Sequence, residues 1–392
     1  MKKKLLCQFF FLCLFLILII NNSFIDLEKN DFNNKIISKD EYSAYNIYPI
    51  NEIFIHEIES NTVLIFEPFK YHYECTPGYS KYFIDLGYKV DIIMNEIGIT
   101  SLCIFDKIKK IRLFIYQNIV EIKQFLEFYS FAFNNYHYIL IETTEPKEFK
   151  LFKNLNLLDI KNSFFVFHHL DYSYSQRFCN LMKNRLWTLG NFSLGTQINP
   201  HYFGTIKPRK KKNKLTKFFI TSTKNRNYQF LISAAEKIKD DNLKFHVTVV
   251  GKWKTFSEND LSYKIKNNFS FKYKVSYTEL YKEVYDSDYI IINLDPENKE
   301  DEEFKNIRVT GSAQLSYGFV KPVLINKNFA NIYKFNSNNS FLYENENFFN
   351  VMKDAINQQN KDYRIMQDNL YLLSTYIYNN SLHNVKNCLK NL

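Results

Sequence analysis

Short apolar runs alternate with polar loops and amphipathic segments along most of this chain, and that alternation restricts the fold more than any other feature. Residues 62–66, 90–94 and 138–143 each have the length and composition of a buried strand. Segments with helical spacing of apolar residues lie between such runs, for example residues 120–133. Repetition of strand, helix and strand predicts an α/β fold with mostly parallel, doubly wound sheets.

The alternation is interrupted once, which predicts two domains. With 392 residues the chain is too long for one ordinary core. Residues 191–214 have no periodic pattern, and the strand and helix pattern restarts at residues 217–222. We therefore expect two Rossmann-like domains that face each other across a cleft. The predicted segments are an N-terminal membrane or signal segment (1–23), a stem with little structure of its own (24–60), a first domain (61–198), a second domain (199–360) and a C-terminal helical segment (361–392).

The N-terminus carries a membrane-targeting pattern. Lysines at positions 2–4 precede an almost unbroken apolar run at residues 5–20. This is typical of a signal peptide or of an uncleaved signal anchor, and the lack of a small-x-small cleavage pattern after the run favours the anchor. The positive-inside rule then predicts a single-pass membrane protein with its N-terminus in the cytosol. The remainder would lie in a secretory-pathway lumen or outside a bacterial inner membrane.

The chain is basic, with a formal net charge of +10, which favours anionic partners such as phosphates, nucleotides or a membrane surface. Nucleic acid is not expected, because the one dense basic run, residues 207–217, is short, contains Pro208 and lacks interleaved aromatic residues. We interpret that run as a solvated linker. The six cysteines show no CxxC spacing, so no zinc site or other metal site is predicted.

Polar residues follow the predicted strands of the second half, where ligands of parallel sheets bind. Lys224 offers a point charge and Arg226 a bidentate fork from one loop. After Thr310, a candidate N-cap, a short helix would present free amides at Ser312 and Ala313 to an anion. This predicts a diphosphate clamp, although an ordinary capped helix beside surface lysines fits the same pattern. The residues in question are Ser222, Lys224, Arg226, Gly251, Glu297, Gly311 and Ser312.

The first half carries acid–base groups at corresponding positions. Glu74 follows strand 62–66, Glu142 lies at the end of strand 138–143, and His168 and His169 end strand 163–168. Because these strand ends would meet at one edge of the sheet, Glu74, His168 and His169 are candidates for a base that takes a hydroxyl proton. The alternative is that the histidines are packed and hydrogen-bonded in the core.

Taken together, these residues resemble nucleotide-sugar glycosyltransferases of the GT-B architecture, over roughly residues 62–357. The matching stretches are His72-x-Glu74-x-x-Pro77-Gly78-Tyr79, Asp85-Leu86-Gly87-Tyr88, Phe167-His168-His169, Asn199-Pro200-His201-Tyr202-Phe203-Gly204, Ile220-Thr221-Ser222-Thr223-Lys224-Asn225-Arg226, Gly311-Ser312-Ala313-Gln314-Leu315-Ser316-Tyr317-Gly318-Phe319 and Lys321-Pro322-Val323.

The resemblance implies a metal-independent, hexosyltransferase-like enzyme without a cofactor, in which the second domain binds the nucleotide-sugar co-substrate. Lys224 and Arg226 would hold the leaving diphosphate, and a cleft residue of the first domain would handle a glycan, lipid or protein acceptor. Many relatives have two glutamates seven residues apart, and the second would fall near Gln314. This departure leaves the donor and the stereochemistry open. It also keeps an alternative, a catalytically inactive GT-B-like protein that binds a glycan or a partner.

Overall fold

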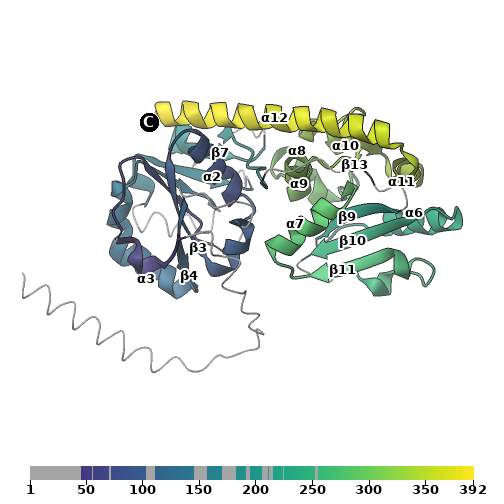
Figure 1. Cartoon of the computed structure of the whole chain (residues 1–392), viewed down its shortest axis with the longest axis horizontal. Helices are drawn as coiled ribbons and strands as arrows, with labels where there is room; N and C mark the ends of the chain where they lie inside the picture. The colour runs from purple at the N-terminus through teal and green to yellow at the C-terminus, as the bar shows by residue number, and fades with distance from the viewer. Residues whose placement is uncertain are drawn as a thin grey trace, which may run out of the picture. The chain divides into compact units, whose positions relative to one another are not determined.

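The computed structural model describes residues 46–392 except 55, 70–71, 103–110, 145–156, 170–181, 191–194, 205–210, 212–214, 224 and 252–254. Within these ranges the chain forms two parallel sheets, and a long C-terminal helix contacts the elements of both (Figure 1). The predicted α/β class with two Rossmann-like halves is therefore confirmed.

The first sheet has the strand order β1-β4-β3-β2-β5-β6-β7-β8, and every neighbouring pair is parallel. Its strands are β1 (Asn46–Pro49), β2 (Thr62–Phe66), β3 (Lys89–Asn95), β4 (Ile111–Tyr116), β5 (Tyr138–Ile141), β6 (Ser163–Phe167), β7 (Leu186–Thr188) and β8 (Thr196–Gln197). Its helices include α2 (Thr76–Asp85), α3 (Ile119–Tyr129) and the 3-10 helices η2 (Ile50–Phe54), η3 (Glu96–Leu102), η4 (Ser130–Asn135), η5 (Leu157–Asp159) and η6 (Lys183–Arg185).

Two predictions for the first half need comment. The stem was expected to have little structure, but β1 (Asn46–Pro49) lies within it and pairs with β4, so the sheet begins inside the predicted stem. The helices predicted near residues 148–155 and 173–183 lie largely outside the described residues. So does the apolar run at residues 5–20. In the part of the chain that the structure describes, no helix combines the length and apolar character that crossing a bilayer requires.

The second sheet has the order β11-β10-β9-β12-β13-β14 and is also parallel. Its strands are β9 (Thr216–Ser222), β10 (Phe245–Gly251), β11 (Phe269–Tyr273), β12 (Tyr289–Ile292), β13 (Val323–Asn326) and β14 (Ser340–Tyr343). The accompanying helices are α6 (Gln229–Asp240), α7 (Tyr277–Asp286), α8 (Lys299–Asn306), α9 (Gly311–Phe319), α10 (Lys327–Ala330), α11 (Phe348–Asn357) and the 3-10 helices η7 (Glu258–Asp260), η8 (Lys266–Asn268), η9 (Asn331–Tyr333) and η10 (Asn345–Asn347).

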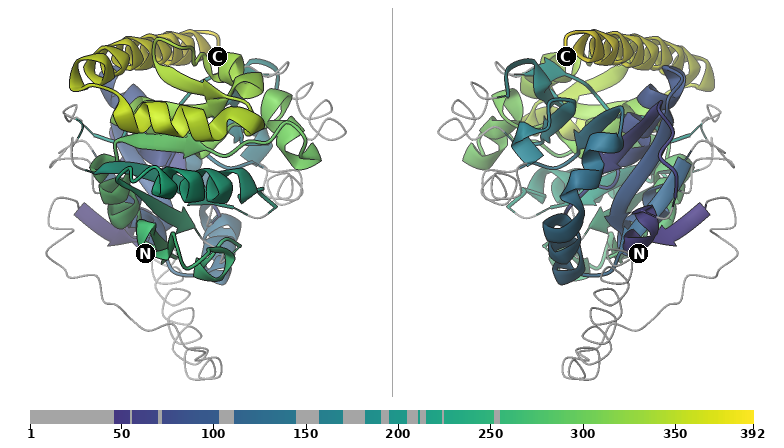
Figure 2. Two further views of the ribbon diagram at one scale, coloured as in Figure 1. Left: turned by 90° about the vertical axis from the view of Figure 1, so that its right-hand side faces the viewer. Right: turned by 90° about the vertical axis from the view of Figure 1, so that its left-hand side faces the viewer.

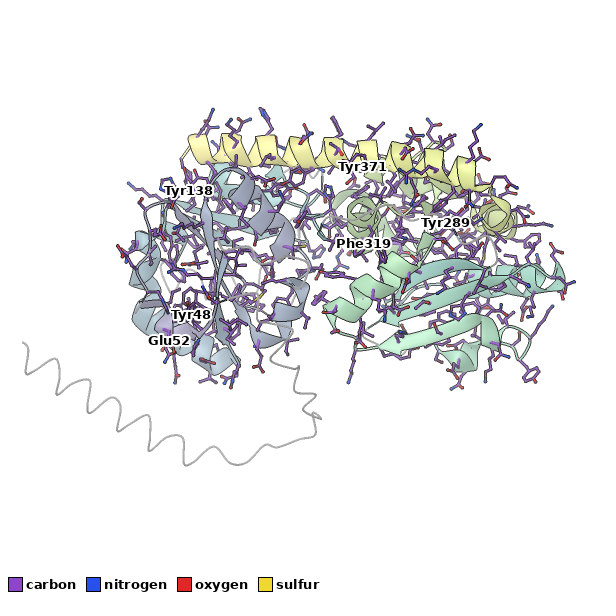
Figure 3. The ribbon with its side chains drawn as sticks, in the orientation of Figure 1. Tyr48, Glu52, Tyr138, Tyr289, Phe319 and Tyr371 are labelled. Atoms are coloured by element: carbon purple, nitrogen blue, oxygen red, sulfur yellow. The ribbon has the colours of Figure 1, made fainter. Side chains whose placement is uncertain are left out.

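Large aromatic side chains fill the space between each sheet and its helices (Figure 3). Trp187, Tyr82 and Phe83 are fully buried in the first half, and Tyr289 and Tyr343 in the second. Burial of each such side chain contributes about 1.5–3 kcal/mol relative to leaving it in water. The apolar runs that the sequence predicted as strands are buried in these two cores, and burial of these runs fixes the positions of the strands.

The long helix α12 (Asn360–Lys390) links the two halves along one side, as Figures 1 and 2 show. Near its start, Tyr363 donates a hydrogen bond to the carbonyl oxygen of Asp288 in the second half, at 2.7 Å. Farther along, the hydroxyl of Ser381 accepts the backbone amide of Asn199 at 3.0 Å. Near its end, Tyr138 of the first half donates to the carbonyl oxygen of Leu389 at 3.2 Å.

The segment that joins the halves, which includes Pro200 and Phe203, is tightly packed. A Cβ atom added to Gly78 of α2 would lie 2.5 Å from the Cα of Pro200. One added to Gly318 of α9 would lie 2.1 Å from a ring carbon of Phe203. Glycine is therefore required at both positions because a larger side chain would clash with these atoms, and not because of the backbone conformation. The sequence pattern indicated that the helix would break at Gly318. Instead, α9 continues through Gly318 to Phe319.

The basic run was interpreted as a solvated linker, and Lys211 departs from that interpretation. Its side chain is buried, and its Nζ donates hydrogen bonds to the carbonyl oxygens of Ala355, Ile356 and Gln358 at 2.9, 2.6 and 3.0 Å. Lys211 therefore binds the free carbonyls at the end of α11, where a positive charge is favoured. Burial lowers the pKa of this lysine to about 8.

Candidate functional site

A cavity of about 400 Å³ opens between the carboxyl ends of the two sheets. The second half supplies most of its wall, including the end of β9 and the start of α9, while Glu74 comes from the loop after β2 in the first half. The residues that line it are Glu74, Phe203, Thr221, Thr223, Arg226, Tyr277, Leu280, Asn293, Phe304, Val309, Thr310, Gly311, Ser312 and Leu315.

The start of α9 presents unused backbone amides to this cavity. Thr310 occupies the N-cap position, as predicted, but its side chain makes no capping hydrogen bond. The amide of Ala313 donates to the carbonyl oxygen of Thr310 at 3.1 Å, so Ala313 is not one of the free amides, contrary to expectation. Among the described residues, the amides of Gly311 and Ser312 have no acceptor. A helix start with free amides favours an anion through its dipole and its N–H groups.

The end of β9 lies beside this helix start. The hydroxyls of Thr221 and Ser312 are hydrogen-bonded at 3.1 Å, which joins strand and helix at the cavity wall. Because Ser312 is a small, buried residue, its backbone can approach the strand end closely enough for this contact. Polar groups from β9 and α9 therefore share one side of the cavity.

Arg226 lines the cavity but already has a carboxylate partner. Its guanidinium forms an ion pair with Asp301 of α8, a residue that is only 2% exposed, and its Nε donates to the hydroxyl of Thr223 at 3.0 Å. The guanidinium carbon also lies 4.7 Å from the centre of the Phe304 ring. Burial lowers the pKa of Arg226, yet a guanidinium keeps its charge in proteins. The Nη2 group makes no hydrogen bond to the described residues and can donate to a ligand.

Of the remaining predicted donor-site residues, Gly251 and Glu297 do not line the cavity. Lys224 lies outside the described residues, and Ser222 ends β9 with a side chain that is likewise not described. Gly251 ends β10 and does not line the cavity. Glu297 is exposed on the loop after β12, where its backbone amide donates to Asp295 at 3.0 Å, and it does not line the cavity either.

Glu74 provides a carboxylate on the opposite side. Its Oε2 accepts a hydrogen bond from the hydroxyl of Tyr277 at 2.9 Å, and its Oε1 lies 3.4 Å from Nδ1 of His72. Burial alone would raise the pKa of Glu74, but the hydrogen bond from His72 and the charge of that imidazole lower it. About a quarter of the side chain (26%) remains exposed. Glu74 is therefore an ionised, accessible carboxylate near neutral pH.

His72 holds Glu74 in place, a role that the sequence did not reveal. Its backbone has a φ of +59°, which is unfavourable for a residue with a side chain and is typical of functional loops. Its ring stacks on that of His168, with centroids 3.8 Å apart. The position of His72 two residues before Glu74, in the loop that follows the buried strand β2, was the available signal.

The two predicted catalytic histidines do not reach the cavity. His168 is buried, and its Nε2 lies 3.0 Å from the carbonyl oxygen of Glu142. Burial and the positive charge of His72 hold the pKa of His168 well below its ordinary value, so it remains neutral. His169 forms a backbone bridge with Arg308, and its Nε2 lies 3.7 Å from Glu303. Of the three predicted acid–base residues, Glu74 alone lines the cavity.

A pair of buried carboxyls lies at the ends of β2 and β5, away from the cavity wall. Glu67 and Glu142 are both 0% exposed, and their side chains accept hydrogen bonds from the hydroxyls of Thr143 and Thr76. Burial raises the pKa of both, and the charge of Glu142 raises that of Glu67 further. Thr76 is the first residue of α2, and its hydroxyl donates to Glu142 at 2.6 Å.

Asn293, which the sequence analysis passed over, follows β12 directly and lines the cavity. Its side-chain oxygen and nitrogen are buried and have no hydrogen-bond partner among the described residues. Such an amide is rare in a folded protein and calls for an explanation. Its position immediately after a buried strand is the same signal that identified Glu74.

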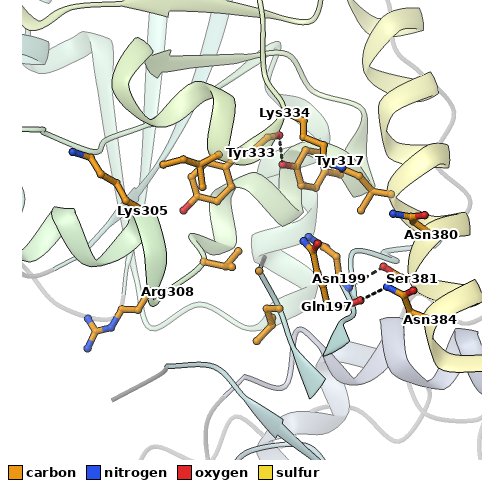
Figure 4. A pocket seen from close by; sticks show the side chains of 15 residues that line it. Gln197, Asn199, Lys305, Arg308, Tyr317, Tyr333, Lys334, Asn380, Ser381 and Asn384 are labelled. Atoms are coloured by element: carbon orange, nitrogen blue, oxygen red, sulfur yellow. Dashed lines mark hydrogen bonds between the residues drawn. The ribbon is translucent and has the colours of Figure 1, made fainter. Parts of the chain in front are cut away.

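A second, smaller pocket lies between α12 and the segment that joins the halves (Figure 4). The polar groups around it mostly bind one another. Asn384 donates to the carbonyl oxygen of Gln197 at 2.9 Å, and Tyr317 donates to that of Tyr333 at 2.6 Å. This pocket is consistent with a structural junction between the halves. In the described parts of the chain, no three or more His, Cys, Asp or Glu side chains are placed to hold a metal ion.

Solved structures share this architecture. An alpha-glucosyltransferase in complex with UDP and a 13-mer DNA superimposes with a TM-score of 0.58 and 10% identity, over 84% of this chain and 100% of that one. S. aureus TarM gives a TM-score of 0.46 with 16% identity, over 65% of this chain and 55% of that one. E. coli ADP-heptose lipopolysaccharide heptosyltransferase II gives 0.46 with 7% identity, over 76% and 99%.

No protein-family model matches the sequence, and no curated protein matches it. The likeness to solved structures shows the fold alone, and that fold is GT-B, as the sequence motifs predicted.

Proposed function

We propose that this chain is a glycosyltransferase that moves a sugar from a nucleotide-sugar donor to a hydroxyl of a glycan, lipid or protein acceptor, without a metal ion. One observation carries the proposal. An ionised carboxylate of the first half, Glu74, lines the same cavity as the free amides of Gly311 and Ser312 and the guanidinium of Arg226. The GT-B fold of a UDP-bound alpha-glucosyltransferase supports the same class of reaction.

In this reaction the acceptor oxygen forms a bond to the anomeric carbon of the donor while the bond from that carbon to the diphosphate oxygen breaks. Glu74 takes the proton of the acceptor hydroxyl. The diphosphate carries away the bonding electron pair, and the amides of α9 and the Nη2 group of Arg226 stabilise its growing charge. Tyr277 and His72 hold the carboxylate of Glu74 in place for the proton transfer.

The N-terminal apolar run also supports a proposal about where in the cell the enzyme is located. An anchor at residues 5–20 would hold the enzyme at a membrane, so that lipid-linked or membrane-bound acceptors would be within reach. Separation of membrane and soluble fractions from cells that express the full chain tests this part independently. Recovery of the full chain in the soluble fraction would contradict it.

Two substitutions at Gly311 test the diphosphate site. Gly311→Pro removes one free amide, and proline is tolerated at the first position of a helix, where its missing N–H has no helical partner. The preceding Thr310 already has an extended backbone, φ −79° and ψ 128°, which suits a residue before proline. Gly311→Ala is the matched control, since its Cβ would meet no atom within 4 Å and the amide is kept.

The measurement is binding of uridine, guanosine, cytidine and adenosine diphosphates by calorimetry and by thermal stabilisation. At 100 times its dissociation constant a ligand adds about 2.7 kcal/mol to stability. We expect Gly311→Pro to weaken the preferred diphosphate about tenfold or more, because a hydrogen bond to a charged group contributes roughly 1.5–3 kcal/mol. Gly311→Ala should change little. If none of the diphosphates binds the unaltered chain, the proposal fails.

An assay of sugar transfer and donor hydrolysis distinguishes the proposed enzyme from an inactive binding protein. Release of free nucleoside diphosphate from the preferred nucleotide sugar, in the presence of a panel of acceptors, should be detected by chromatography. Tight binding without any turnover on any acceptor would favour the binding protein instead.

A further inference from the structure

The side chain of Asn293 is the least satisfied polar group in the cavity wall. It is 8% exposed, it lies directly after β12, and neither its Oδ1 nor its Nδ2 has a partner among the described residues. A buried amide left in this state is unfavourable, so a ligand that supplies its partners is the simplest reason for its presence.

A neighbouring polar residue, Asp295, has hydrogen-bond partners within the protein. Asp295, two residues later, accepts hydrogen bonds from Asn227 at 3.1 Å, from Asn345 at 3.0 Å and from the amide of Glu297 at 3.0 Å. It is therefore fully engaged within the protein. Asn293 is separated from it by Leu294 alone and has none of these contacts, so the unpaired amide belongs to the cavity and not to the loop.

The chemistry of an amide limits what it can bind here. The groups from β9 and α9 that face a diphosphate are all donors: the amides of Gly311 and Ser312 and the guanidinium of Arg226. Asn293 offers a donor and an acceptor side by side, and its acceptor oxygen would repel a phosphate oxygen. A hydroxyl group both donates and accepts, so hydroxyls of the donor molecule fit both atoms of the amide.

We propose that Asn293 binds hydroxyl groups of the transferred sugar and determines which sugar the enzyme accepts, an inference that rests on the glycosyltransferase function proposed above. The ribose of the nucleotide also carries hydroxyls. The experiment must therefore distinguish the sugar from the ribose as the source. A site built to hydrogen-bond a hydroxyl rejects an analogue in which that hydroxyl is missing or inverted, because its polar atoms are then left unpaired.

The test compares Asn293→Ala and Asn293→Ser with the unaltered full chain. For each, the dissociation constants of the preferred nucleoside diphosphate and of its glucose, galactose and N-acetylglucosamine conjugates are measured by calorimetry. We expect the diphosphate to bind within about twofold of the unaltered protein. The preferred nucleotide sugar should weaken about tenfold, as expected for the loss of one hydrogen-bonded pair. The preference between the glucose and galactose epimers should fall by a similar factor.

Gln367 provides the matched control. It is a buried amide of α12 whose Oε1 also lacks a partner among the described residues, but it does not line the cavity. Gln367→Ala should leave the ratio of diphosphate to nucleotide-sugar affinity unchanged. A change in that ratio equal to the one in Asn293→Ala would overturn the assignment, because any buried amide would then have the same effect.

The outcomes separate the two proposals. If the diphosphate and the nucleotide sugar weaken by the same factor in Asn293→Ala, the amide binds the nucleotide and the sugar assignment is wrong, while the transferase function stands. If all affinities are unchanged, the sugar assignment is also wrong. If the unaltered chain binds no diphosphate, both proposals fall. A melting temperature close to that of the unaltered chain shows that each variant is folded.

Discussion

The two sheets present different chemistry to the same cavity, although both are parallel. The first sheet ends in carboxyls and imidazoles, which bind one another: Glu74 contacts His72, and His72 stacks on His168. The second sheet ends in donors, the free amides of Gly311 and Ser312, that have no protein acceptor in the described chain. The first sheet therefore places a carboxylate at the cavity, and the second places free backbone amides there.

The difference also extends to how charge is buried. Each half contains an arginine and aspartate pair with a buried carboxylate. In the first half Arg112 binds both oxygens of Asp91 at 2.7 Å, within the sheet. In the second half Arg226 binds Asp301 at the cavity wall. The first pair lies within the sheet, whereas the second holds a guanidinium at the cavity wall, where it would face the diphosphate under the proposed function.

The largest expected effect comes from removing the proton acceptor of the first half. Glu74→Gln keeps the size of the side chain and its contact with Tyr277 but cannot take a proton. We expect turnover to fall by roughly 10²–10⁴, the usual contribution of a general base. Binding of the nucleoside diphosphate should be nearly unchanged. Steady-state kinetics and calorimetry on the same samples measure both, and unaltered turnover would show that the carboxylate has no catalytic role.

The two ion pairs allow the contrast between the halves to be tested directly. Asp301→Ala leaves a buried guanidinium without its partner, which should lower the free energy of unfolding by about 3–5 kcal/mol. It should also weaken diphosphate binding, since Arg226 loses its orientation. Asp91→Ala in the first half is the control. It should lower stability, measured by urea denaturation, and leave diphosphate affinity intact. Equal effects of both variants on affinity would remove the functional distinction between the pairs.

The packing of the joining segment against the second half gives a smaller effect. Gly318→Ala would place a methyl group 2.1 Å from the Phe203 ring and 2.5 Å from the carbonyl oxygen of His201. The carbonyl cannot move without the backbone, so we expect a loss of about 1–3 kcal/mol in stability, as in other overpacked sites. Gly311→Ala on the same helix meets no atom and should be neutral. A neutral Gly318→Ala would mean that the joining segment shifts easily.

The smallest effect concerns the buried carboxyl pair of the first half. Burial raises the pKa of Glu142 above its ordinary value of 4.5, so the folded state retains a proton that the unfolded state has lost. Stability contributed by this group is present below pH 4.5 and is lost as the pH rises toward the folded pKa. Glu142→Gln has no such proton, and its amide can take the place of the unpartnered Oε1.

We therefore expect the free energy of unfolding of Glu142→Gln to fall less between pH 5 and pH 8 than that of the unaltered protein. The difference between the two proteins should grow as the pH rises, because each pKa unit corresponds to about 1.4 kcal/mol. Urea denaturation at several pH values measures it. Parallel pH profiles for the two proteins would show that the carboxyl is not protonated in the folded state.

The strands were predictable because they are buried on both faces and read as continuous apolar runs. The run at residues 62–66, for example, forms β2 (Thr62–Phe66), in which every residue is buried, and Glu74 was found because it follows such a run. The helix start at Gly311 was predictable from local chemistry as well. In each case the relevant information lies within a few adjacent residues.

The contacts that complete the site were not predictable, because they join residues far apart in the sequence. Asp301 lies in an acidic segment that reads as a solvated helix, yet it is buried against Arg226, 75 residues earlier. Lys211 lies in a run of basic residues that reads as a linker, yet it binds the end of α11. The stacking of His72 on His168 depends on the order of β2, β5 and β6 in the sheet, which the sequence did not determine.

The long helix α12 follows both sheets in the sequence, so it leaves the ribosome after them, and it contacts both halves. The surface of the first sheet around Tyr138 therefore stays uncovered until α12 has been synthesised. Contacts between residues 251 positions apart form slowly compared with local ones. Early termination within α12 would thus release a chain that lacks the contacts of this helix with both halves, a form that quality control should recognise by its exposed apolar surface.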